Sequence, residues 1–275
     1  MEGAIDMSCA FLPRFAESLI MPFTVSHAAA VLPLRRYLPA LPLSAMVIGS
    51  MVPDLGFLIP HLDRHLSHGF GGLFLFCLPM GWLAQWLFWR GLQGPLLDLA
   101  PRSVQRRLQA VLGMESRSWL HVSAALLLGA TSHSVWDGFT HLDGFVARAW
   151  PLLRLPLFVF GDEPMRVCEV LQHASSALGL VALAMYACRW FSRSSPGEAR
   201  AMQYRVFWML VFLLIPASAG LLSLLVWLPA PAAGHIAAMA AGRGLQAAGG
   251  CLLVYALWWH RRRARQQQAG LRLGR

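Results

Sequence analysis

The sequence predicts an all-α fold, a polytopic membrane bundle of about six transmembrane helices with both termini in the cytoplasm. The chain is 57% hydrophobic and only 13% charged, whereas soluble domains average about 25% charged residues. Several uncharged apolar stretches approach or exceed the roughly 18–20 residues that a helix needs to cross a bilayer. Arginines gather between these stretches, as the positive-inside rule describes.

Six apolar segments are the predicted spans: 38–59, 70–89, 119–137, 171–188, 206–228 and 236–259. With six spans, three arginine-rich regions fall on one side together with Arg35 and Arg36: 90–117, 189–205 and 260–265. The positive-inside rule makes that side cytoplasmic. The opposite side receives 60–69, 138–170 and 229–235.

The basic balance indicates topology and not nucleic-acid binding. The net charge of +10 comes from 23 basic residues, all of them arginine, and no basic stripe is interleaved with exposed aromatic residues, as a nucleic-acid interface would require. The five cysteines show no C-x-x-C spacing, which argues against a disulfide framework or a cysteine zinc site. The lipid bilayer is therefore the expected partner.

The chain divides by composition into three parts. Residues 1–20 carry early acidic residues and no basic segment, so they resemble an N-terminal extension more than a signal peptide, and Met21 is the expected start. Residues 21–260 form the single predicted integral membrane domain, and residues 261–275 the basic cytoplasmic tail. The apolar stretch 150–160 contains prolines and is too short to span, which predicts a loop or a shallow interfacial helix.

Ionisable residues near the ends of the predicted spans are the candidates for chemistry. His27 follows Thr24 and Ser26, either of which could cap a helix. Asp54 follows the helix-breaking Pro53, where it could merely cap the next turn. The segment 61–68 has His61, His65 and His68 on one face if it is helical, with Asp63 and Arg64 between them. Ordinary surface histidines are the alternative there.

The most informative stretch is "GATSHSVWDGFTH", which ends at His141. On a continuous helix, His133, Asp137 and His141 lie along one stripe. A carboxylate inside a bilayer is costly and usually faces a partner or a water-filled cavity. Imidazole nitrogen and carboxylate oxygen both bind zinc, manganese or iron. The alternative is a hydrogen-bonded pair that only ends the helix.

The predicted topology places Asp54, His68, Asp137, His141 and His173 near one membrane face, although separate helices carry them. Such convergence is how metal sites and proton relays are built. His27 begins on the opposite side, so it joins the group only if 24–37 forms a re-entrant arm buried in protein.

Five blocks of the chain resemble an uncharacterised bacterial family of multi-pass membrane proteins that is catalogued only as a domain of unknown function. The blocks occur in the family's order between Met21 and about residue 180: "MPFTVSHAAAVLPL", "LSAMVIGSMVPDL", "SHGFGGLFLFCLPMGW", "GATSHSVWDGFTH" and "LQHASSALGL". This resemblance implies a multi-pass protein of the bacterial cytoplasmic (inner) membrane.

More remotely, the order of these motifs is similar to that of the bacterial inner-membrane proteins described as membrane-bound metal-dependent hydrolases, which are in turn likened to zinc-dependent phospholipases. The resemblance implies that the metal ligands are His27, Asp54, His68, His133 and Asp137. In those relatives a second Asp and a His often follow at once, whereas here "LGFLIP" comes after Asp54. The number of metals and their chemistry therefore do not transfer directly.

These observations lead to one main hypothesis and two alternatives. The main one is a membrane-embedded hydrolase that uses a divalent metal such as zinc on a lipid-like or phosphoester substrate, for example an isoprenoid phosphate, at the non-cytoplasmic face. Asp63, His141 and His173 would orient the ligands or carry protons. The alternatives are a proton- or cation-coupled transporter and a non-enzymatic scaffold with a structural His/Asp cluster.

Overall fold

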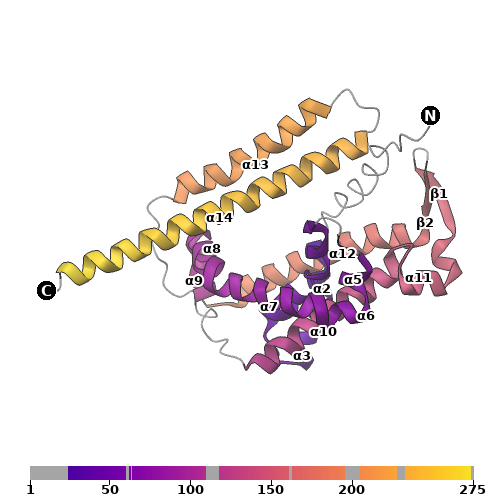
Figure 1. Cartoon of the computed structure of the whole chain (residues 1–275), viewed down its shortest axis with the longest axis horizontal. Helices are drawn as coiled ribbons and strands as arrows, with labels where there is room; N and C mark the ends of the chain where they lie inside the picture. The colour runs from indigo at the N-terminus through magenta and orange to yellow at the C-terminus, as the bar shows by residue number, and fades with distance from the viewer. Residues whose placement is uncertain are drawn as a thin grey trace, which may run out of the picture. The chain divides into compact units, whose positions relative to one another are not determined.

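The computed structural model is helical over most of its length and divides into two compact units (Figure 1). One unit comprises residues 23–88 and 110–196, and the other comprises residues 1–22, 89–109 and 197–275. The structure describes residues 24–59, 62, 64–109, 118–160, 163–195, 205–227 and 233–273. The predicted extension at residues 1–20 lies outside these ranges.

The first unit begins with an arm of short helices separated by prolines. In chain order they are η1 (Thr24–His27), α2 (Ala28–Val31), α3 (Leu34–Tyr37), α4 (Leu43–Gly49) and the 3-10 helix η2 (Pro53–Leu58). Pro42 precedes α4 and Pro53 begins η2, and proline cannot continue a helix because it lacks a backbone N–H. The prediction of one continuous span over 38–59 is therefore wrong.

A longer helical stretch follows, over the predicted span 70–89. It starts after α5 (Arg64–His68) and consists of α6 (Phe70–Gly72), a π-helical turn η3 (Leu73–Cys77), α7 (Leu78–Leu87), a second π-helical turn η4 (Phe88–Leu92) and α8 (Gln93–Leu99). The π turns lie within the stretch and do not break it, so the helical run extends from Phe70 to Leu99.

Helix α10 (Trp119–Thr140) packs against α4, α7 and α12 in the first unit. It approaches α4 closely because glycines face each other. A Cβ atom at Gly129 would collide with the backbone of Met46, and one at Gly49 would collide with the backbone of Leu126. A small hydrophobic core lies beside this contact, formed by Val52, Leu73, Cys77 and Ala130.

The unit ends with a hairpin and a long helix. After α11 (Phe145–Ala149) and η5 (Pro151–Arg154), strand β1 (Pro156–Phe160) pairs antiparallel with β2 (Glu163–Arg166), and α12 (Val167–Arg193) follows. The loop or interfacial helix predicted for 150–160 is thus replaced by a 3-10 turn and a strand. A short run of apolar residues can form either a helix or a strand. Here the backbone pairing with β2 stabilises the strand.

The second unit contains α8, α9 (Arg102–Gln109), α13 (Arg205–Trp227) and α14 (Ala233–Leu273). Helices α13 and α14 run alongside each other (Figure 1). Tyr255 and Trp259 of α14 donate hydrogen bonds to the Pro95 carbonyl and the Asp98 carboxylate of α8. Residues 261–273 of the predicted tail continue α14 as helix.

The helical prediction is confirmed, while the count of six spans stays a prediction. Among the described residues, two helical stretches are long and apolar enough to cross a membrane, Phe70–Leu99 and Val167–Arg193, and Val206–Leu221 is a shorter apolar helix. They coincide with the second, fourth and fifth predicted spans.

The glycine contact between α4 and α10 can be tested by adding a single methyl group. We expect Gly129→Ala to lower stability by roughly 1–3 kcal/mol, as overpacking of a tight interior does. Thermal unfolding of the detergent-solubilised protein measures the change. Gly71→Ala is the matched control, because a Cβ atom at Gly71 would meet no heavy atom within 4 Å. Equal melting temperatures for the two variants would contradict the close packing.

Candidate metal centre

Four ionisable side chains from three parts of the first unit meet at one point. Asp54 comes from η2, His68 ends α5, and His133 and Asp137 lie one turn apart on α10. One ligand atom from each lies within 4.8 Å of all the others. His133 and Asp137 are buried at 0% and 4% exposure, so the group is enclosed in protein.

The spacing of these atoms matches that of ligands around one metal ion. His133 Nε2 lies 3.3 Å from Asp54 Oδ1 and 3.4 Å from Asp137 Oδ2. His68 Nε2 lies 3.5 Å and 3.4 Å from the same two oxygens. Ligands at about 2.0–2.1 Å from a tetrahedral ion are separated by about 3.4 Å. These four nitrogen–oxygen distances are therefore compatible with one shared metal ion.

The other ring nitrogen of each histidine is engaged by a neighbouring group. His133 Nδ1 donates to the Ser50 carbonyl at 2.8 Å, so the neutral ring has its lone pair on Nε2. His68 Nδ1 lies 2.8 Å from Ser67 Oγ, whose own proton goes to the Arg64 carbonyl, and this makes His68 Nδ1 the donor. Both rings thus direct Nε2 lone pairs into the cluster, as metal-binding histidines do.

Each carboxylate also accepts a hydrogen bond from a neighbouring side chain, at Oδ2 of Asp54 and at Oδ2 of Asp137, the Asp137 oxygen that faces both histidines. Thr24 donates to Asp54 Oδ2 at 2.6 Å, which leaves Oδ1 directed at the two histidines. Arg64 donates to Asp137 Oδ2 at 2.8 Å and forms a second ion pair with the exposed Asp143. Within the described part of the chain, Asp54 Oδ1 and His133 Nε2 are buried without a hydrogen-bond partner. Such orphaned polar atoms are costly unless a ligand satisfies them.

His27 reaches this cluster. Its ring stacks on that of His133 at a centroid distance of 4.0 Å, and Nε2 lies 3.6 Å from Asp137 Oδ1. The arm η1–α2, which packs against α10 and α12, carries it there. That this arm is re-entrant in a membrane stays a prediction. Burial lowers the pKa of His27 to about 4. Its imidazole is therefore neutral at pH 7, the form that coordinates metals.

Of the three residues predicted to support the ligands, Asp63, His141 and His173, only His141 contacts the cluster in the described part of the chain. His141 Nδ1 lies 3.6 Å from Asp137 Oδ1 and its Nε2 contacts Gln172 at 3.1 Å, while burial lowers its pKa. His173 is exposed on α12, and in the described residues its neighbour Gln172, not His173, reaches the cluster. Asp63 lies outside the described residues.

Sequence reasoning did not assign roles to four residues that support the cluster: Thr24, Ser50, Arg64 and Ser67. The sequence predicts Thr24 only as a helix cap, yet Thr24 donates to the Asp54 carboxylate 30 positions away. Arg64 lies between histidines in the sequence, yet it pairs with Asp137 on another helix. No spacing rule predicts contacts across such separations, so the sequence offered no signal for these roles.

Comparison with known proteins gives a family and nothing further. The family model "Domain of unknown function (DUF4184)" matches residues 21–258, which is most of the chain. Neither the curated proteins nor the solved structures contain a match. What the site does must therefore be inferred from its own geometry.

Metal content is the direct test of this site. We expect the purified protein to carry about one divalent ion per chain, measured by elemental analysis, and Asp137→Asn and His133→Gln to lose it, because each removes one of four ligands. Asp143→Asn is the matched control, since Asp143 pairs with Arg64 and is not one of the four candidate ligands. Folded wild-type protein without metal after incubation with zinc, manganese and iron(II) would contradict the site.

Loss of the Thr24 hydroxyl should weaken metal binding without abolishing it. Groups that orient a ligand typically contribute about 10- to 100-fold to metal affinity, so Thr24→Val should lower affinity within that range in a competition titration with a chelator. Thr131→Val provides the control, because Thr131 is exposed on α10. An unchanged affinity for Thr24→Val would show that the Asp54 orientation does not depend on this bond.

Proposed function

We propose that this chain, which belongs to the DUF4184 family, is a membrane-embedded metal-dependent hydrolase that acts on a phosphoester or lipid-like substrate. The observation that carries the proposal is the buried set of Asp54, His68, His133 and Asp137, whose ligand atoms lie within 4.8 Å of one another. The long apolar helices of the same chain support a location in the membrane.

The donor set favours zinc, with manganese and iron(II) as alternatives. Two imidazoles and two carboxylates are typical zinc ligands, and the same set accepts harder divalent ions. Cys77 is buried nearby, but its sulfur donates to the Ser67 carbonyl, so the set contains no thiolate. A bound ion that accepted a water in addition to these side chains, or in place of one of them, would supply a Lewis acid and an activated water for hydrolysis.

Three further side chains of the cluster can serve the reaction. The Arg64 guanidinium lies against Asp137 with its side chain 23% exposed, a position from which it could bind an anionic phosphoryl oxygen. His27 and His141 both lie 3.6 Å from Asp137 Oδ1. Because burial lowers the pKa of each, both are neutral at pH 7 and can accept a proton during hydrolysis.

The substrate class and the membrane face follow from the predicted topology. The arginine distribution predicts that the cluster faces the non-cytoplasmic side of the bacterial inner membrane. A site at that face of the membrane would be accessible to a lipid or an isoprenoid phosphate that diffuses in the bilayer. We therefore propose this class of phosphoester as the natural substrate.

The two alternatives use the same residues in other ways. A proton- or cation-coupled transporter would need ionisable residues through the depth of the membrane, whereas this cluster is concentrated around Asp137. A scaffold would need the cluster only for packing. It would tolerate a double substitution of His133 and Asp137 to alanine without loss of metal or phenotype.

Hydrolysis assays on metal-loaded protein test the proposal. We expect wild type in lipid nanodiscs to release phosphate or alcohol from aryl phosphate mono- or diesters, or from polyprenyl phosphates. Chelation and Asp54→Asn should abolish the turnover. We expect Arg64→Gln to keep the metal and lose about 10- to 100-fold in activity, the usual effect of removing a partner of a metal ligand.

The matched control is Arg148→Gln, because Arg148 in α11 has no contact with the cluster among the residues described. The transporter hypothesis would replace the hydrolase hypothesis if two results were found together. The protein would bind metal without hydrolysing any of these esters, and it would carry metal- or proton-coupled flux in proteoliposomes. Bound metal with neither activity would leave the scaffold.

A further inference from the structure

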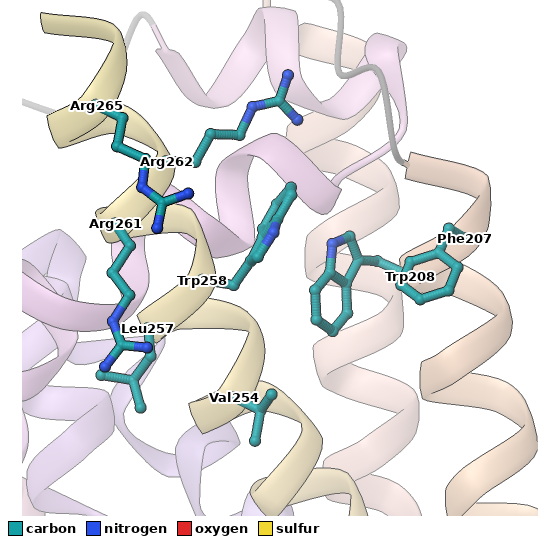
Figure 2. A pocket seen from close by; sticks show the side chains of 8 residues that line it. All are labelled: Phe207, Trp208, Val254, Leu257, Trp258, Arg261, Arg262 and Arg265. Atoms are coloured by element: carbon teal, nitrogen blue, oxygen red, sulfur yellow. The ribbon is translucent and has the colours of Figure 1, made fainter.

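A second feature lies in the other unit, far along the chain from the metal ligands. Helices α13 and α14 enclose a groove of about 790 Å³ that is lined by eight side chains (Figure 2). We call it the α13–α14 groove. Among the described residues, the side chains that line it are apolar, aromatic or arginine, and none is acidic.

The α14 side of the groove is one amphiphilic stripe. Val254, Leu257, Trp258, Arg261 and Arg265 recur at helical spacing and so share one face of the helix. The stripe is apolar at its beginning and basic at its end. Over these 11 positions a helix rises about 16 Å, close to half of the roughly 30 Å hydrocarbon core of a bilayer.

The α13 side supplies aromatic walls. Figure 2 shows the Trp208 ring of α13 directed toward Trp258 of α14, with Phe207 next to Trp208 on α13. The rings of Trp208 and Trp258 are in contact, with centroids 5.3 Å apart, and the guanidinium of Arg262 lies 5.4 Å from the Trp258 ring centroid. Indole rings beside arginines are typical of the level of the lipid headgroups.

The apolar part of the groove is open to its surroundings. Phe207, Val254 and Leu257 are 58%, 60% and 59% exposed. Side chains of this kind on a membrane helix face acyl chains. The basic part holds Arg261, Arg262 and Arg265 within two turns of helix. Arg261 and Arg265 are exposed at this end of the groove, where their guanidinium groups can bind an anion.

We propose that the α13–α14 groove binds one anionic phospholipid. Its phosphate lies among Arg261, Arg262 and Arg265, and an acyl chain lies along Leu257 and Phe207. A planar guanidinium binds phosphate through two parallel hydrogen bonds, and basic pockets between membrane helices on the cytoplasmic side suit anionic headgroups. The proposal does not depend on the metal site, because none of the groove residues belongs to it.

Lipid retention by the intact protein tests this site. Wild type in mild detergent is incubated with phosphatidylglycerol or phosphatidylcholine, and the bound lipid is counted by native mass spectrometry. We expect one phosphatidylglycerol per chain, and about 100-fold weaker binding for the variant R261Q/R262Q/R265Q, since each arginine near an anionic lipid contributes roughly fivefold. Circular dichroism and gel filtration verify that the variant is folded.

The matched control is R102Q/R106Q/R107Q, which removes the same charge from α9 of the same unit. A second readout is quenching of Trp208 and Trp258 fluorescence by brominated phosphatidylglycerol, with the difference between wild type and W208F/W258F isolating these two indoles. This readout remains informative if the arginine variant fails to fold.

Several outcomes would overturn the proposal. If R261Q/R262Q/R265Q and R102Q/R106Q/R107Q lost phosphatidylglycerol binding equally, the effect would be one of net charge and not of the groove. Equal retention of phosphatidylcholine would remove the anionic specificity. Displacement by inorganic phosphate alone would assign the groove to a free anion. Co-purification of an acidic protein that the arginine variant releases, without bound lipid, would make it a protein interface instead.

Discussion

The close contact between α4 and α10 is the constraint on which the metal centre depends. Gly49 and Gly129 let the two backbones meet, and this brings the Ser50 carbonyl within 2.8 Å of His133 Nδ1. Asp54 follows Ser50 by four residues, and Asp137 follows His133 by four. One backbone contact therefore places a ligand pair from α10 opposite a ligand from the arm, and it also sets the tautomer of His133.

The buried cluster carries negative charge that a bound cation would neutralise. Asp137 pairs with the Arg64 guanidinium, which also pairs with the exposed Asp143, and Asp54 accepts a hydrogen bond from the neutral Thr24 hydroxyl. Buried charges are costly unless they are paired, and the neutral His27 and His141 add none. A divalent cation among the four ligand atoms would offset the remaining negative charge and satisfy Asp54 Oδ1 and His133 Nε2, which have no hydrogen bond in the described structure.

The fold could be predicted where a single physical signal dominates and not where tertiary pairing decides. Long apolar runs specify helices by themselves, so α12 and α13 correspond to the predicted segments 171–188 and 206–228. Segment 38–59 is equally apolar, but its prolines divide it into α4 and η2. The strand β1 arises only because β2 offers backbone hydrogen bonds to it, and apolar composition alone carries no information about that partner.

By itself, the sequence determined which side chains on one helix share a face, because helical periodicity is a local property. That is why His133 and Asp137 could be placed together on one face of α10. Only the tertiary structure decided that His27 stacks on His133, that Thr24 and Arg64 hold the two carboxylates, and that His173 stays exposed while Gln172 contacts His141. These contacts join distant segments through turns at prolines and glycines, and their geometry depends on how whole helices pack.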